Sequence, residues 1–276
     1  MTDFSTCFQR PARPLNQFID VLWLYQGYTQ PYQKERHLPT GTMQLIINFG
    51  QETVRLYDAH QTERFEEFSS AVLCGVYAEP FVIDTACQNS VMGVCFKPGG
   101  TLPFFGLPAN HLRDIHVSLE DLWHRQASNL RDQLLEARTP ATKFRVIEQY
   151  LLAHLCPSVN HHPAVAYAIQ AFECTSGRHI VSEVAGQIGL SARHFGQIFS
   201  EEVGLSPKLY YRIRRFQNLL CHIHSGDNID WADMALRCGY YDQSHFIHDF
   251  QTFSGINPTT YTALQPHHQN HVPLLD

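Results

Sequence analysis

An internal repeat in the last hundred residues constrains the fold of this chain more than any other feature. Segment 185–210 matches segment 235–261, with a constant offset of 51 residues from the central histidine onward. An earlier alanine and glycine match at an offset of 50, so one residue is inserted in the turn between them. The matching pairs are Ala185 and Ala235, Gly189 and Gly239, His194 and His245, Phe195 and Phe246, Phe199 and Phe250, Gly204 and Gly255, Pro207 and Pro258, and Tyr210 and Tyr261. The repeat predicts two copies of one helical unit.

Each copy has the pattern of a helix, a tight turn and a second helix. Gly189 or Gly239 suits the turn, and Ser191 or Asp242 can cap the helix that follows. A proline after each copy, Pro207 or Pro258, suits the first turn of a further helix. A single unit of this kind fits a plain helical hairpin equally well. The duplication favours a pair of helix-turn-helix units.

The second helix of each copy buries its aromatic side chains, so its opposite face is expected to point outwards. Arginine on such a face can pair with guanine, glutamine can pair with adenine, and isoleucine can pack on a thymine methyl group. The outward residues are Ala192, Arg193, Gly196, Gln197 and Ser200 in the first copy, and Gln243, Ser244, Ile247, His248 and Gln251 in the second. Both faces are therefore candidate readers of base edges.

Segment 162–264 resembles the DNA-binding domain of the AraC/XylS family of bacterial transcription regulators, most closely in GYYDQSHFIHDFQTFSGINPTTY at 239–261. The resemblance implies recognition helices at 191–203 and 242–253, joined by a long helix that starts at Pro207. Both helices would enter successive major-groove segments about one helical turn, ~34 Å, apart. The implied base contacts are Arg193, His194, Gln197, Gln243, Ser244 and His248.

Two features depart from the family pattern. His248 stands where the family often has arginine, and Gly196 leaves the middle of the first reading face bare. The segment 161–264 holds seven Lys and Arg against nine Asp and Glu, which gives a net charge of −2 within a chain of net charge −6. We therefore expect weak non-specific DNA binding, with helix N-termini supplying much of the phosphate contact. The candidate backbone contacts are Arg178, Ser191, Arg212, Arg215 and Asp242, although an arginine cluster on a long helix is more often a salt-bridged face.

The first hundred residues show short β-branched and aromatic runs broken by turn residues. The runs are MQLIINF, TVRLY, AVLCGVY, FVIDT and VMGVCF, and their spacing predicts an antiparallel sandwich or barrel. Apolar residues at helical spacing follow at 114–124, 127–137 and 141–155. The predicted fold is thus α+β and multidomain. Its parts are a β-rich sensing domain at 1–110, a helical connector at 111–160, an all-α domain with two helix-turn-helix units at 161–264, and a flexible tail at 265–276.

The segment 10–155 resembles a sensing domain that precedes this DNA-binding module in some members of the family. The resemblance implies a transcription activator that holds a small-molecule effector in a β-barrel, a helical pair that forms a homodimer, and contact with RNA polymerase. A barrel of this size can enclose one small ligand. The candidate effector contacts are His37, Asn48, Tyr77 and Lys97, although each fits a structural role in the core or a turn better.

Several other classes are disfavoured. The longest apolar runs are far shorter than a membrane span needs, and the N-terminus lacks the pattern of a secretion signal, so we expect a cytoplasmic, nucleoid-associated protein. The eight cysteines contain no C-x-x-C pair, and His37 and His60 are far apart, so neither a metal, a cofactor nor catalysis is expected. The alternative is a Cys-based methyl-accepting repair protein, or a redox or metal sensor, fused to a DNA-binding module. Cys95 near Lys97 is its candidate thiol.

Overall fold

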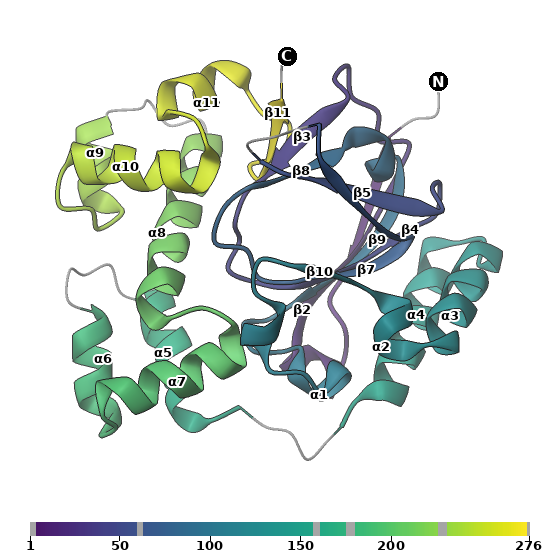
Figure 1. Ribbon diagram of the computed structural model, residues 1–276, viewed down its shortest axis with the longest axis horizontal. Helices are drawn as coiled ribbons and strands as arrows, with labels where there is room; N and C mark the ends of the chain where they lie inside the picture. Colours follow the sequence, from purple (N-terminus) through teal and green to yellow (C-terminus); the bar gives the residue numbers. More distant parts are fainter. Residues whose placement is uncertain (1–3, 60–62, 157–160, 175–179, 226–230, 275–276) are drawn as a thin grey trace.

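The computed structural model describes residues 4–59, 63–156, 161–174, 180–225 and 231–274 (Figure 1). Its N-terminal part contains two antiparallel sheets that curve around a shared interior. The six-stranded sheet has the order β1 (Ser5–Gln9), β2 (Ile19–Gln26), β9 (Ser90–Phe96), β4 (Gln44–Asn48), β7 (Ala71–Cys74) and β10 (His116–Ser118). The five-stranded sheet has the order β11 (His271–Leu274), β3 (Lys34–His37), β8 (Phe81–Asp84), β5 (Thr53–Tyr57) and β6 (Phe65–Ser69). The predicted barrel-like β domain is confirmed.

The six-stranded sheet uses its two faces differently because side chains alternate along each strand. In β4, Leu45 and Ile47 belong to the hydrophobic core, whereas Gln44 and Ile46 line the interior between the sheets. Helices cover the core-facing side. They are α1 (Leu102–Phe105), α2 (Leu119–Trp123), α3 (Arg125–Glu136) and α4 (Pro140–His154), and α2 to α4 lie together beside β4 and β7 (Figure 1). Short 3-10 turns are η1 (Leu15–Gln17), η2 (Thr85–Gln88) and η3 (Ala109–Leu112).

The helices at 111–160 were expected to form a connector. Leu119, Leu130 and Ile147 are each 0% exposed and share one core with the sheet. These helices therefore complete the N-terminal domain as well as leading to the next one. The first helix predicted there, at 114–124, begins instead with a strand. This short strand, β10, pairs with β7.

The C-terminal domain is all helical, as the repeat predicts. Its helices are α5 (Pro163–Cys174), α6 (Ile180–Ile188), α7 (Ala192–Val203), α8 (Pro207–His224), α9 (Trp231–Arg237), α10 (Gln243–Ser254) and α11 (Pro258–Leu264). The predicted caps are present, because the side chains of Ser191 and Asp242 accept hydrogen bonds from the third backbone amide of α7 and α10. Gly189 and Gly239 adopt φ of +72° and +78° in the two turns, a conformation that suits glycine.

The segment after α11 corrects an expectation. We predicted a flexible tail at 265–276, but His271–Leu274 forms β11 and pairs antiparallel with β3. Val272 is 0% exposed, and the amide of Leu38 donates to the carbonyl of Asn270 at 2.9 Å. A terminal strand is ordered when an open sheet edge offers backbone partners, and this partner lies more than 230 residues earlier in the chain.

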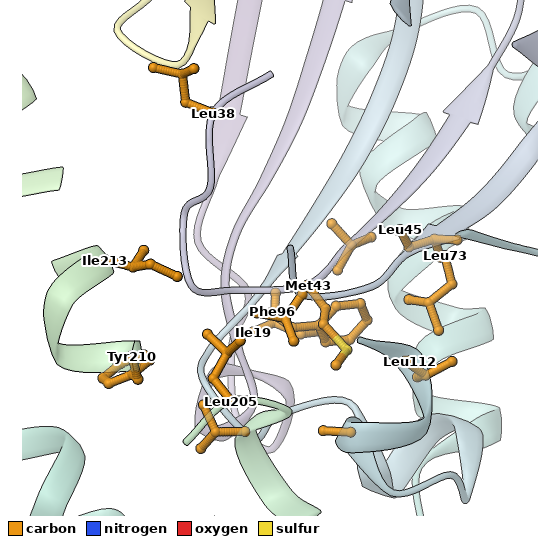
Figure 2. Packing of buried hydrophobic residues seen from close by; sticks show 14 of the residues in the cluster. Ile19, Leu38, Met43, Leu45, Leu73, Phe96, Leu112, Leu205, Tyr210 and Ile213 are labelled. Atoms are coloured by element: carbon orange, nitrogen blue, oxygen red, sulfur yellow. The ribbon is translucent and has the colours of Figure 1, made fainter. Parts of the chain in front are cut away.

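The two domains share one hydrophobic core. Figure 2 shows Leu205 of the helical domain next to Ile19 of the N-terminal domain, and Tyr210 and Ile213 belong to the same cluster of buried residues. Gly41, with φ +76°, lies so near that a methyl group there would be 3.4 Å from the Tyr210 ring. The helical domain is therefore packed against the sheets along α8.

Candidate DNA-reading surface and effector cavity

Helix α7 presents the first predicted reading face. Its aromatic face is buried, with Phe195 at 2% and Phe199 at 0% exposure. Arg193, His194 and Gln197 are exposed, as the periodicity predicts. The Gln197 amide nitrogen donates to the carboxylate of Glu201 at 2.9 Å, one turn further along the helix. The first face therefore presents one cation and one oriented amide.

Helix α10 presents the second face in the same way. Phe246, Phe250 and Phe253 are buried beneath it. The candidate readers Gln243, Ser244 and His248 are all exposed. The structure thus places every predicted base-contact residue on an outward surface, in two separate groups on two equivalent helices.

The arginines of α8 have another role than the expected phosphate contact. Arg215 donates to the Asp249 carboxylate at 3.0 Å and to the Gly239 carbonyl at 3.0 Å, and its side chain is 9% exposed. Arg212 donates to the same carboxylate at 3.1 and 2.6 Å. A buried cation committed to a carboxylate is not available to DNA, so the expectation for Arg215 is corrected. Of the other backbone candidates, Ser191 and Asp242 are exposed helix caps, and Arg178 lies outside the described residues.

This network joins α8, the turn at Gly239 and α10. Asp249 itself is 1% exposed, and Arg215 also lies 4.4 Å from the centre of the Tyr240 ring. Sequence patterns alone do not identify Asp249 as a positioning residue. In the sequence, Asp249 is marked only by its helical spacing from the buried aromatic residues of α10. Its partners Arg215 and Arg212 are 34 and 37 residues away.

A cavity of about 750 Å³ lies between the two sheets and extends to the helical domain. Its walls include strand residues from both sheets, α5, α8 and the segment 268–271. The four predicted effector contacts, His37, Asn48, Tyr77 and Lys97, all line it. A ligand in this space would therefore touch both domains.

Three of these four side chains are already engaged. Asn48 donates to the Cys87 carbonyl and accepts from the amides of Gly50 and Gln51, as a turn residue does. The Lys97 ammonium donates to the Asn16 carbonyl at 2.7 Å. Tyr77 is hydrogen-bonded to Nδ1 of His116 at 2.7 Å. The fourth, His37, has a buried Nδ1 without a hydrogen-bond partner among the described residues.

Further titratable residues, besides His37, lie in the same region. Glu35 is 0% exposed, and its Oε1 accepts from Gln88 at 2.9 Å and from His271 at 2.6 Å. Burial lowers the pKa of His116 to about 4 and that of His268 to about 3, and it holds the pKa of His37 well below 6.5. These three imidazoles are therefore neutral near pH 7. Glu35 carried no sequence signal, because KERH is a short polar run without alternation.

The thiol and metal alternatives find no support in the described part of the chain. Burial, together with a smaller effect of the nearby Asp20, raises the pKa of the Cys95 thiol to about 11, which is the opposite of an activated thiolate. The described residues contain no group of three or more His, Cys, Asp or Glu side chains that could hold a metal ion. None of the described helices is long and apolar enough to cross a membrane.

Comparisons with known proteins give two matching family models. Residues 8–118 match a domain of unknown function, DUF6597, and residues 184–263 match a helix-turn-helix domain. No curated protein sequence matches the chain.

Among solved structures, the chain is similar to ToxT from Vibrio cholerae at 11% identity and a TM-score of 0.50, over 94% of this chain and 98% of ToxT. A second ToxT structure, from strain O395, gives 10% identity and a TM-score of 0.46, over 94% of this chain and 97% of that one. At such low identity, the match with a TM-score of 0.50 shows similarity of fold alone. That fold is a β-rich domain followed by a helical domain.

Proposed function

We propose that the chain is a sequence-specific DNA-binding transcription regulator controlled by a small molecule, because a segment that matches a helix-turn-helix domain follows one that matches the DUF6597 domain. One observation carries the proposal. Helices α7 and α10 are equivalent halves of a repeat, and both expose polar side chains suited to base edges while they bury their aromatic faces. In this role the protein works at the bacterial nucleoid, in the cytoplasm.

The charges of the helical domain favour specific over general attraction to DNA. Arg212 and Arg215 are bound to Asp249, which removes two cations from the supply available to phosphates. Arg193 on α7 is exposed and becomes the main cation of the first reading face. Affinity should therefore depend strongly on Arg193 and Gln197 in one half of the site, and on Gln243, Ser244 and His248 in the other.

Control by a ligand is supported by the position of the cavity. Arg214 and Gln217 of α8 line it, and α8 connects the two reading helices. Gln217 also donates to the Pro39 carbonyl at 2.7 Å and to the Asn270 side chain at 2.8 Å, so it joins α8 to the β3 and β11 side of the cavity. A bound effector would act on α8 through these contacts and shift the DNA-binding state.

Two partners complete the proposal. The exposed Leu135 on α3 and Leu152 on α4, at 44% and 46%, are candidates for a homodimer contact. The regulator would act as an activator and contact RNA polymerase from its DNA site. Crosslinking of the purified protein and of its DNA complex with polymerase tests both partners.

The experiment that tests the proposed function is an electrophoretic shift and footprint on the DNA upstream of the gene. We expect a sequence-selective shift, with a salt dependence shallower than that of a protein neutralising ~8 phosphates. The variant Arg193→Ala should weaken it. The absence of any selective shift, with and without small-molecule extracts, would overturn the proposed function.

A further inference from the structure

The inner part of the cavity has an aromatic wall built around Phe81. The Phe81 ring lies 4.8 Å from the His37 ring at an interplanar angle of 16°, 4.5 Å from Tyr77 and 5.0 Å from His116. All four side chains line the cavity. Flat rings on neighbouring strands offer faces and edges to a planar ligand.

A second group of aromatic side chains lines the cavity from β2. Trp23 on β2 lies over Gly93 of the neighbouring strand β9, and a methyl group at Gly93 would sit 2.1 Å from the indole. Gly93 therefore leaves room for the indole to lie across the strand. Tyr25 follows on the same face, with its ring 4.6 Å from that of Trp23. Both rings line the cavity.

The inner part is poor in charge. The Asp, Glu, Lys and Arg side chains along the described cavity wall are Asp20, Lys97, Glu173 and Arg214. Lys97 directly follows β9, Glu173 is on α5 and Arg214 is on α8, so these three charges belong to the boundary with the helical domain, whereas Asp20 lies near the start of β2. The imidazoles of His37, His116 and His268 are neutral near pH 7. The buried Glu35 accepts from His271 and Gln88 through Oε1, while its Oε2 has no hydrogen-bond partner among the described residues. A carboxylate or phosphate inside the barrel would be left without a cation.

The inner polar groups are mostly engaged with one another. Tyr77 bonds to His116, Asn48 bonds to its own turn, and Gln88 bonds to Glu35. A sugar would bury several hydroxyl groups that lack partners there, at a cost for each. His37 differs, since its buried Nδ1 has no partner among the described residues while the ring lines the cavity. A polar group of a ligand that reached this nitrogen would give it a hydrogen-bond partner.

We propose that the cavity takes an uncharged, planar aromatic molecule that carries one hydroxyl or N–H group, with the ring between Trp23 and Phe81 and the polar group on His37. This assignment rests on the proposed function, because it names the chemical class of the effector. A phenol is the simplest molecule of this class.

The assignment is tested by calorimetric titration of the full-length protein at pH 7 with three ligands of similar shape. They are 4-ethylphenol, ethylbenzene, which lacks the hydroxyl group, and 4-ethylbenzoate, which carries a charge. We expect 4-ethylphenol to bind several-fold more tightly than ethylbenzene and about tenfold more tightly than 4-ethylbenzoate, since one net hydrogen bond is worth up to about tenfold and a buried uncompensated charge costs at least that factor. The variant His37→Phe should bind 4-ethylphenol and ethylbenzene equally.

Equal or tighter binding of 4-ethylbenzoate would overturn the assignment, and so would the absence of 4-ethylphenol binding up to its solubility limit. An unchanged preference for 4-ethylphenol in His37→Phe would overturn the role of His37. If that variant does not fold, the comparison of the three ligands on the natural chain still decides the class. Selective DNA binding is measured on the same samples. If the three ligands do not bind as expected while DNA binding stays selective, only the proposed ligand class is rejected. If DNA binding is not selective, the proposed function is rejected.

Discussion

The Glu35 carboxylate on β3 accepts a hydrogen bond from Nδ1 of His271 on β11 at 2.6 Å, although the two residues are 236 positions apart. Glu35 belongs to the N-terminal sheet, and His271 follows the second helix-turn-helix unit. The end of the DNA-reading domain is therefore built into the sheet of the sensing domain. Through this connection, a change in the cavity can be transmitted to α11 and α10.

Insertion of a charge into β11 should detach this strand. Val272 is 0% exposed, so Val272→Asp buries an unpaired carboxylate and should lower the free energy of unfolding by about 3 kcal/mol. Hydrogen exchange of the β3 amides should become faster at the same time. Gln265→Asp, an exposed position before the strand, is the control. Unchanged β3 protection in Val272→Asp would contradict the pairing.

Two glycines at helix ends allow a matched test of the packing between α7 and the N-terminal domain. Gly204 and Gly255 both have positive φ, +87° and +72°, so alanine at either costs about 1 kcal/mol in backbone strain. At Gly204 the added methyl group would also lie 2.4 Å from Val76 and 2.9 Å from the Ala109 carbonyl, whereas at Gly255 the nearest atom is 3.6 Å away. Gly204→Ala should therefore lower the free energy of unfolding, measured by denaturant titration, by a further ~1 to 3 kcal/mol. Equal losses would mean that α7 does not pack on the N-terminal domain.

Removal of the Asp249 charge should disturb the second reading helix. Asp249→Asn leaves Arg215 buried without its carboxylate, which we expect to cost about 3 kcal/mol of stability. Because the network joins α8 to α10, DNA selectivity should be lost first at the second half of the site. Asp233→Asn is the control, since its 3.9 Å ion pair with Arg237 is exposed and should change the melting temperature little. A melting temperature for Asp249→Asn equal to that of the control would contradict the role of the network.

Acid should destabilise the sensing domain through its buried histidines. The unfolded chain takes up a proton on His116 near pH 6.5, but the folded protein does so only near its lowered pKa of about 4. Between these values the unfolded state binds more protons, so stability falls as the pH falls, by up to ~1.4 kcal/mol per pH unit for this residue. His116→Asn should reduce the slope of unfolding free energy against pH between 6 and 5. A slope identical to that of the natural chain would show that His116 titrates normally.

Local signals allowed the DNA-reading helices to be predicted from the sequence. Ser191 before α7 and Gly204 after it each act within one turn of the helix, and the repeat supplied the same boundaries for α10. The strands with apolar runs, such as β4 and β9, were predicted for the same reason. All six candidate reading residues are exposed, but their contacts with bases stay predictions.

Long-range contacts explain what the sequence did not reveal. Nothing near His271 indicates that β3 would accept it as a strand neighbour, and nothing near Arg215 indicates that Asp249 neutralises it. The polar run that holds Glu35 gave no strand pattern, because its burial depends on Gln88 and His271. Such pairings depend on the assembled fold, so local patterns cannot identify them.

Selection of bound DNA from a random pool tests the two unequal reading helices most directly. It is carried out with the natural chain, with Arg193→Ala and with Gln243→Ala, and Arg145→Ala on the exposed side of α4 is the control. We expect two sequence blocks about one helical turn apart, with Arg193→Ala relaxing one block and Gln243→Ala the other, by ~1 to 3 kcal/mol at the contacted base pair. Arg145→Ala should leave both blocks unchanged. Enrichment of no sequence by the natural chain, or identical blocks for all four proteins, would contradict DNA reading by α7 and α10.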